Sequence, residues 1–409
     1  MELLHYADTF WEKSITTHHE YDVIVIGAGF TGLITAILLT KKGYKTLVLE
    51  ANNSLGKGAS GRNSGFVAPA LSRNTPSDII KKYGSMAKNF IEGLNQSANN
   101  LFSLLQETGL DCGVTSNGWL QTFIKSAEQL NLTKYFNEWQ QTGANVALLN
   151  KEALHSLTGS SRYSTGILFK EGGQLDPLKS LYALKKHFIN MGGSIVLGEP
   201  VNQWEKIINN LLVYTNTHTY RAKKIIFTGN TYSNKPLNLN KNLIVKVPML
   251  LAVFKMEYKH ILANNTPISD TEVDFSFFRK IDDQYMMTGL LAPNHLTTQA
   301  IDNILLNKIK VTFNIELATS LKQWTGNIGL TLNGFPHLVK YDDNVFGWTG
   351  CNGRGLCLSY LMAQSLTAAV DNQPILLPYS KIPNINTTRL QQLLTHTYLK
   401  IKRPTNKSN

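Results

Sequence analysis

The apolar and polar positions near the N-terminus of the chain predict one strand–helix–strand unit. Residues 21–26, YDVIVI, form a short β-branched run that is typical of a buried strand. Residues 31–41 have the apolar spacing of a helix, and Gly43 ends it. Residues 45–49 form a second buried strand. The pattern therefore predicts two parallel strands joined by a right-handed helical crossover.

The rest of the chain alternates between helical and β-rich stretches. The pattern over residues 76–150 is mainly helical. Strands are predicted over residues 166–169, 194–197, 211–214 and 224–227, and a helix over residues 178–190. A β-rich stretch follows between residues 243 and 290, and the last elements are a strand over 345–348 and a helix over 355–370. Because 409 residues exceed what one core usually holds, we expect two domains.

The composition indicates a folded protein without a membrane span. Hydrophobic residues make up 43% and charged residues 17% of the chain. The longest apolar runs, over residues 33–39 and 248–254, are far shorter than the roughly 20 residues that a spanning helix needs. The first twenty residues contain acidic side chains and no apolar run, so we expect no secretory signal.

The cysteines argue against disulfides and against a metal site. Cys112, Cys351 and Cys357 are an odd and sparse set, which is typical of a reducing compartment, and we expect a cytoplasmic protein. No cysteine or histidine has metal-site spacing. The GxSxG, P-loop and HExxH patterns are absent, so hydrolase and kinase functions have no support.

The charge is concentrated in a basic C-terminal tail. The net charge is +12, and no acidic residue follows Asp371. A solvated tail is the simplest interpretation; the alternative is peripheral contact with the inner face of a membrane. Residues 387–399 could form a helix with leucines on one side, which could pack on the protein or lie on that surface.

A dinucleotide fingerprint follows the first strand. In the segment GAGFTG, Gly27 makes the turn, Gly29 admits a pyrophosphate, and Gly32 lets helix and strand pack closely. The positive end of the helix suits a diphosphate. Glu50 ends the second strand and can accept hydrogen bonds from a ribose hydroxyl.

The loop over residues 56–65, GKGASGRNSG, distinguishes FAD from NAD. Its small residues permit close approach of the backbone to a ligand. Arg62 offers a fork for phosphate, and Asn63 offers both a donor and an acceptor. An NAD dehydrogenase has no need of such a loop at this point, so the pattern favours FAD.

The chain resembles the D-amino-acid-oxidase superfamily of FAD-dependent oxidoreductases, and within it the gamma-glutamylputrescine oxidases. The resemblance covers most of the chain and includes DVIVIGAGFTGL, GASGRNSG, GGQLDPLKSLYAL, QWTGNIGLTLNGFP and GCNGRG. It implies an α/β fold: a Rossmann-like FAD domain of the glutathione-reductase type, interleaved with an α+β substrate domain on a large mixed sheet. We expect the FAD domain over residues 1–85, 151–235 and 330–380, the substrate domain over 86–150 and 236–329, and the tail over 381–409.

The resemblance also implies a set of cofactor residues. These are Gly27, Gly29, Phe30, Thr31, Gly32, Glu50, Ala51, Gly58, Ala59, Ser60, Arg62, Asn63, Ser64, Val201, Gly229, Asn230, Gly353, Arg354, Gly355 and Leu356. Val201 would contact the adenine through its backbone, and the helix after Arg354 would face the pyrimidine edge of the flavin. No histidine lies in the loop and no cysteine lies near Gly326, so the FAD is expected to be non-covalent.

The substrate side departs from the related sarcosine oxidases. The two basic residues that hold the substrate carboxylate there correspond to Gly65 and Cys357, and the lysine that activates oxygen corresponds to Met287. Arg279 could replace the carboxylate anchor, or it could be a surface or ion-pair residue. Further substrate candidates are Cys351 and Trp324; Trp324 could join Trp348, Phe277 and Phe278 in an aromatic wall, although such residues are more often core.

The expected reaction is the oxidation of a carbon–nitrogen bond of a small amine, such as a gamma-glutamylated polyamine, to an imine by hydride transfer to the flavin. Oxygen or a quinone would accept the electrons. One alternative is a D-amino-acid or N-methyl amino-acid dehydrogenase that passes electrons to a quinone. Another is a flavoenzyme that modifies a transfer RNA base, which the net charge permits but which no basic patch supports. A protein that holds FAD without turnover is the last alternative, and the intact motifs argue against it.

Overall fold

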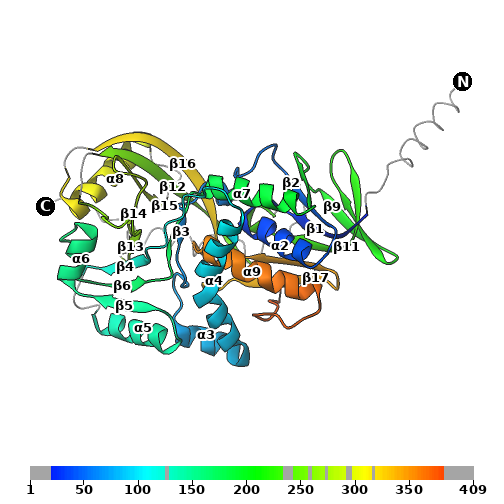
Figure 1. Cartoon of the computed structure of the whole chain (residues 1–409), viewed down its shortest axis with the longest axis horizontal. Coiled ribbons are helices and arrows are strands. Elements are labelled where there is room, and N and C mark those ends of the chain that lie inside the picture. The colour runs from blue at the N-terminus through cyan, green and yellow to red at the C-terminus, as the bar shows by residue number, and fades with distance from the viewer. Residues whose placement is uncertain are drawn as a thin grey trace, which may run out of the picture.

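The computed structural model describes residues 20–124, 129–233, 243–256, 260–271, 275–291, 297–315 and 318–381, without the side chains of residues 129–131. Figure 1 shows two lobes side by side along the long axis of the molecule, each built on one large sheet. Helices α4 (Ala87–Glu107) and α9 (Gly355–Val370) lie between the lobes. The expected tail helix over residues 387–399 lies outside the described residues.

The first sheet has the strand order β17-β18-β11-β1-β2-β8, and strands β9 and β10 continue from β11. Its strands are β1 (Glu20–Ile26), β2 (Thr46–Glu50), β8 (Ser194–Leu197), β9 (Gln203–Ile207), β10 (Asn210–Tyr214), β11 (Thr219–Phe227), β17 (His337–Asp342) and β18 (Val345–Thr349). The central pairs are parallel: β1 pairs with both β11 and β2, and β2 pairs with β8. Their carboxyl ends therefore meet at one edge, which is where α/β sheets bind ligands.

The parallel strands and the helices that pack on them carry buried apolar side chains. Val23, Ile24 and Val25 in β1 are fully buried, as expected for a strand that is covered on both faces. Helix α2 (Phe30–Lys41) follows β1, and α7 (Pro177–Asn190) begins at a side-chain cap from Asp176. Helices α2, α7 and α9 pack together on one face of the sheet (Figure 1).

The second sheet is mixed and has the order β16-β12-β15-β14-β13-β4-β6-β5. Its strands are β4 (Trp119–Phe123), β5 (Val146–Leu149), β6 (Thr165–Phe169), β12 (Val245–Met256), β13 (Ile268–Asp270), β14 (Phe277–Lys280), β15 (Tyr285–Leu291) and β16 (Ala318–Leu330). The remaining helices are α3 (Pro76–Tyr83), α5 (Gln129–Gln141), α6 (Lys151–Thr158) and α8 (Thr298–Phe313). A short ribbon of β3 (Phe66–Val67) and β7 (Gly173–Gln174) lies near α9.

The α/β architecture agrees with the expected fold, and two features differ in detail. Strand β6 pairs with β4 in the second sheet, so residues 151–169 lie with that sheet rather than with the FAD domain, where we expected them. Strand β4 interrupts the stretch over residues 76–150 that was predicted to be mainly helical, and helix α8 lies in a stretch for which no element was predicted. Residues 119–123 form strand β4 because of tertiary pairing, since both of its partner strands come from distant parts of the chain.

Candidate functional site

The glycines of the fingerprint make a cradle at the carboxyl end of β1. A Cβ atom on Gly32 would lie 1.8 Å from the carbonyl oxygen of Gly27, so only glycine allows this close packing of helix and strand. Gly27 has a φ of 105°, which favours glycine. The hydroxyl of Thr228, at the end of β11, donates to the carbonyl oxygens of Ile26 and Gly27 at 2.9 and 3.0 Å and fixes the turn.

Two helices begin at this cradle without a side-chain cap. Helix α2 begins after Gly29 and helix α9 begins after Arg354, and neither has a side-chain cap or an acidic residue in its first turn. The first N–H groups of a helix need acceptors, and its N-terminus carries roughly half a positive charge. The two ends are therefore suited to the anionic and carbonyl groups of a flavin dinucleotide.

Glu50 lies at the end of β2, beside this cradle. One carboxylate oxygen accepts the N–H of Ala28 at 2.9 Å, and the other accepts the backbone and side-chain N–H groups of Asn52 at 3.0 and 2.7 Å. These contacts fix the carboxylate and still leave lone pairs free for the hydroxyls of a ribose.

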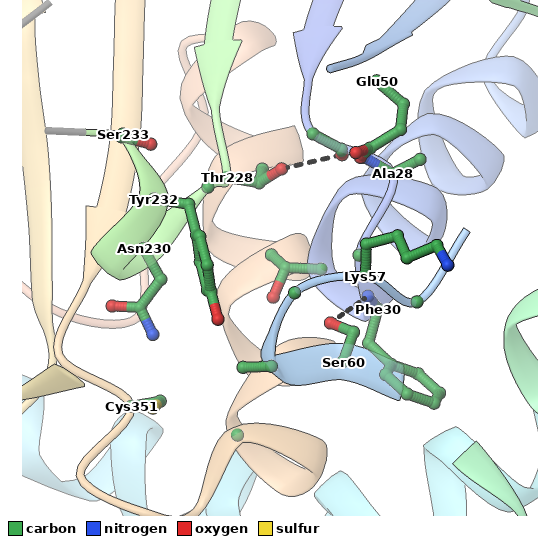
Figure 2. Close-up of a pocket in the computed structure, with 18 of the residues that line it drawn as sticks. Ala28, Phe30, Glu50, Lys57, Ser60, Thr228, Asn230, Tyr232, Ser233 and Cys351 are labelled. Atoms are coloured by element: carbon green, nitrogen blue, oxygen red, sulfur yellow. Dashed lines mark hydrogen bonds between the residues drawn. The ribbon is translucent and has the colours of Figure 1, made fainter. Parts of the chain in front are cut away.

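A cavity of about 490 Å³ extends from this cradle toward the second sheet. Figure 2 shows Lys57 and Ser60 on one side of it, Tyr232 and Asn230 on the other, and Glu50 and Cys351 toward opposite ends. Its charged lining residues are Glu50, Lys57 and Glu199. Lys57 is thus the one cation among the described lining residues, and it can compensate the charge of a diphosphate.

Residues 199–201 line one end of the cavity. They include Val201, which the resemblance predicts to contact the adenine, and the buried Glu199. Burial alone would raise the pKa of Glu199. Hydrogen bonds from Thr215, Thr217 and His218 outweigh that effect and hold its pKa below the ordinary value.

The loop over residues 56–65 folds back on itself under the cavity. Ser60 Oγ accepts the N–H of Phe30 at 3.3 Å, and Asn63 donates to the carbonyl oxygens of Ala59 and Ser60 at 3.1 and 2.7 Å. Arg62 points elsewhere, because its guanidinium donates to the carbonyl oxygen of Thr325 in β16 at 3.3 Å. The fork that we expected to bind phosphate instead joins the loop to the second sheet.

The turn before α9 closes the end of the cavity that lies away from Glu50. Asn230 Oδ1 accepts from Thr349 Oγ1 at 3.0 Å and from the N–H of Gly350 at 3.1 Å. Asn352, with a φ of 48°, accepts the N–H of Thr331 at 2.8 Å. These bonds hold Cys351 at the cavity wall, and they fix the position of the helix N-terminus.

The second sheet presents an apolar face toward this region. Leu251, Phe277 and Met287 form a buried cluster, and Phe66 and Trp324 pack against it. Trp324 lies opposite Leu251 in the sheet, so both project from the same face. Phe277 and Trp324 therefore lie on one face, as an aromatic wall would require, whereas Phe278 belongs to the core on the opposite face. Trp348 does not come from this sheet, and it lines the cavity from β18.

Arg279 lies on this apolar face, opposite Met287. Its side chain is buried, its Nη1 donates to the carbonyl oxygen of Ser64 at 2.8 Å, and its Nε has no partner. A Cβ atom on Gly65 would lie 2.0 Å from Nη1, so the guanidinium occupies the space that a side chain at position 65 would need. Burial lowers the pKa of Arg279 to about 10, and Asp176 opposes the shift.

Most of the predicted cofactor residues line the cavity. They are Gly27, Gly29, Phe30, Thr31, Glu50, Ala51, Gly58, Ala59, Ser60, Asn63, Ser64, Val201, Gly229, Asn230, Gly353, Gly355 and Leu356, together with the substrate candidate Cys351. Gly32, Arg62, Arg354, Arg279, Trp324 and Met287 do not line it. The sequence interpretation missed Lys57, Glu199, Tyr232, Ile328 and Phe66, which line it. Lys57 was within the recognised loop and could have been found by its charge.

Within the described ranges no group of three or more histidine, cysteine or acidic side chains could hold a metal ion. In the same part of the chain no helix combines the length and the apolar character that crossing a membrane requires.

A family model described as FAD dependent oxidoreductase, DAO, matches residues 22–369. The gamma-glutamylputrescine oxidoreductase of Escherichia coli is 24% identical over 350 residues, which are 83% of this chain and 81% of that protein. Two solved structures have a similar fold. Glycine oxidase from Geobacillus kaustophilus has a TM-score of 0.75 at 16% identity and covers 90% of this chain and 99% of its own. L-proline dehydrogenase from P. horikoshii has a TM-score of 0.72 at 14% identity and covers 93% of this chain and 99% of its own.

Proposed function

The chain belongs to the DAO family of FAD-dependent oxidoreductases, and from this premise we propose that it oxidises a carbon–nitrogen bond of an amine that also carries a carboxylate. A gamma-glutamylated polyamine is the substrate type that we favour, because it has both groups and because the E. coli relative is named for such a compound. The product would be an imine, which water hydrolyses.

One observation carries the substrate part of the proposal. Arg279 is a buried cation on an otherwise apolar sheet face, its Nε has no partner, and no described carboxylate lies within ion-pair distance of it. Asp176 favours the charged form from a distance, but a buried guanidinium that forms no ion pair is still costly, and a substrate carboxylate would offset that cost. The apolar side chains of Phe277 and Trp324 would accommodate the rest of the substrate.

When bound, the flavin supplies an acceptor for two electrons and one hydrogen from the carbon next to the nitrogen. The residues of this chain would bind the cofactor and orient it. The N-termini of α2 and α9 would stabilise its negative charge, Glu50 would hold a ribose, and Lys57 would compensate the diphosphate. The amine must be neutral when it reacts, and the apolar face favours that form by desolvation.

The electron acceptor is proposed to be a quinone or a similar compound rather than oxygen. Met287 stands in an apolar cluster where the resemblance leads us to expect a lysine in oxygen-using relatives, so the cation that favours the reduction of oxygen there is missing at this position. The neighbouring cation, Arg279, donates to the carbonyl oxygen of Ser64, and we assign it to the substrate carboxylate instead. Slow recolouring of the reduced protein in air, and fast recolouring with an added quinone analogue, would support this.

A substrate panel tests the proposal. The FAD-loaded protein would be assayed with gamma-glutamylputrescine, putrescine, sarcosine and several D-amino acids. Turnover of gamma-glutamylputrescine but not putrescine supports both the amine and the carboxylate requirement. Turnover of putrescine at equal kcat/KM would refute the carboxylate requirement, and preference for a D-amino acid or sarcosine would favour the amino-acid dehydrogenase alternative.

A further inference from the structure

Helix α7 carries exposed, mainly apolar side chains on the face that points away from the protein. Leu178, Tyr182 and Ile189 are 44%, 47% and 44% exposed. Because an α-helix turns about 100° per residue, these three side chains lie within about 40° of one another and form one stripe. The other face of α7 packs on α2 (Figure 1) and carries the buried Leu181 and Leu184. The stripe is therefore additional to the face that the fold buries.

Two lysines accompany this stripe. At the same helical spacing Lys185 lies within the stripe, and Lys186 lies on its flank. Neither lysine forms an ion pair within the described residues, and α7 contains no acidic residue. The exposed face of α7 therefore combines apolar side chains with positive charge that no neighbouring carboxylate compensates.

The apolar surface continues onto the loop that follows α4. Lys179, in the first turn of α7, pairs with Asp111 of this loop at 2.7 Å, and this ion pair compensates the one carboxylate there. Leu110 and Val114, on either side of Asp111 in the chain, are also exposed. Exposed apolar side chains that gather in one region of a surface indicate contact with a partner.

The stripe begins beside the loop that forms the cofactor cavity. A Cβ atom on Gly56, which lines the cavity, would lie 2.7 Å from Leu178 Cδ1. Helix α7 also packs on the short helical turn Ala59–Gly61 of the same loop. A partner bound to the exposed face of α7 would therefore lie next to this loop.

From these observations we propose that the exposed face of α7, formed by Leu178, Tyr182, Lys185, Lys186 and Ile189, docks on a bilayer that contains anionic lipids. In such contacts the apolar side chains enter the boundary between headgroups and acyl chains, and the lysines contact the headgroups. The net charge of +12 attracts the whole protein to the same surface. Docking in this orientation would hold the loop over residues 56–65 near the bilayer, where a lipid-soluble quinone dissolves; this last step alone rests on the proposed function.

Charge favours a bilayer over a second copy of the chain. In a twofold contact the same surface meets itself, so Lys185 and Lys186 of one copy would face the equivalent lysines of the other. Like charges repel at such distances, and α7 supplies no carboxylate to separate them. Anionic headgroups would instead compensate both lysines.

Vesicle flotation of the full-length, FAD-loaded protein tests the surface without turnover. Vesicles with equal parts of phosphatidylglycerol and phosphatidylcholine would be compared with vesicles of phosphatidylcholine alone. The test variant is Lys185→Gln/Lys186→Gln/Ile189→Ser, and the control variant is Ile80→Ser/Lys81→Gln/Lys82→Gln in α3. The control is matched because α3 also exposes an isoleucine beside two consecutive lysines, so both variants lose the same side chains and the same charge.

We expect the wild type and the α3 control to float with the anionic vesicles, and the α7 variant to bind at least about 10-fold more weakly. Each lysine near an anionic surface contributes a factor of about 5 to binding, and the isoleucine adds to that. Vesicles of phosphatidylcholine alone should bind every form weakly, and added salt should weaken the binding of the wild type. The α7 variant should keep the FAD affinity of the wild type, which shows that it folds. Should it fail to fold, Lys186→Gln alone should weaken binding by about 5-fold, and Lys82→Gln alone should not.

Three results would overturn the proposal. They are a wild type that does not float, equal flotation of the wild type and the α7 variant, and a wild-type dimer in sedimentation that the α7 variant loses. The second result would assign the binding to another part of the chain, and the third would assign the face to a second copy. A protein that floats as expected but oxidises no amine would refute only the proposed function.

Discussion

The substitution Gly29→Ala should weaken FAD binding and only slightly destabilise the FAD-free protein. Gly29 has a φ of −77° and a ψ of −178°, which alanine adopts without strain. Its Cβ would lie 2.7 Å from Ser60 Oγ, and the next atom, Ser60 Cβ, is 3.6 Å away. Apart from the neighbouring residues in the chain, no other heavy atom lies within 4 Å of this Cβ, so the methyl would project into the cavity.

The size of the effect follows from these contacts. The Ser60 side chain can rotate away at the cost of the Phe30 N–H···Ser60 Oγ hydrogen bond, so Gly29→Ala should lower the free energy of unfolding of the FAD-free protein by about 1 kcal/mol. The methyl also reaches the space predicted for the diphosphate, and such overpacking costs about 1–3 kcal/mol, or about 5- to 150-fold in the Kd for FAD.

The double variant Gly29→Ala/Ser60→Ala distinguishes the two effects. Removing the hydroxyl removes the clash with Ser60, so the second substitution should add little to the loss of stability measured by urea unfolding of the FAD-free protein. It should not restore FAD affinity, measured by quenching of flavin fluorescence. Restored FAD affinity in the double variant would refute the reasoning that Gly29 is needed for the diphosphate.

Three further predictions concern charge. Lys57→Gln should weaken FAD binding by about 3- to 10-fold at low salt, with a smaller difference at high salt because Lys57 is exposed; a difference independent of salt would contradict a charge effect. Arg279→Gln should raise KM for carboxylate-bearing amines by about 10- to 100-fold, because the charged partner of the carboxylate is lost; an unchanged KM in the variant would exclude the anchor. His337, whose pKa is lowered by burial to about 4, stays neutral in the folded protein, so stability should fall by up to about 3 kcal/mol as pH drops from about 6.5 to about 4, where the unfolded chain binds the extra proton. The variant His337→Gln should lack that part of the pH dependence in urea unfolding, and an identical slope would contradict the assignment.

The features that were predicted best from the sequence are those formed by residues close together in the chain. The cofactor cradle is local, because strand, glycines and helix are consecutive, and the helix over residues 355–370 agrees with α9 at both ends. The sequence also contains the pattern of helix α8, because Ile301, Leu305 and Ile309 repeat every four residues after the side-chain cap at Thr297.

The direction of long side chains could not be predicted from the sequence. Arg62 and Arg354 both lie in recognised cofactor motifs, yet one donates to Thr325 and the other packs on Trp119. Each partner belongs to a strand of the second sheet that is distant in sequence. A motif fixes the backbone around such a residue, whereas tertiary packing decides which way a flexible guanidinium points.

The same limit applied to the substrate side. Arg279 was recognisable as a cation in a strand, but its place beside Gly65 depends on β14 lying against the loop after residue 64. The space that a side chain at Gly65 would need is filled by Arg279, which lies 214 positions later in the chain, and no local sequence pattern predicts such a contact.

The most direct test of the central claim is the visible spectrum of the FAD-loaded protein, recorded without oxygen before and after addition of a carboxylate-bearing amine. We expect the flavin to bleach, and we expect deuterium on the carbon next to the nitrogen to slow the bleaching, because that carbon–hydrogen bond breaks. A protein that binds FAD, is bleached by dithionite and is bleached by no amine or amino acid would contradict it.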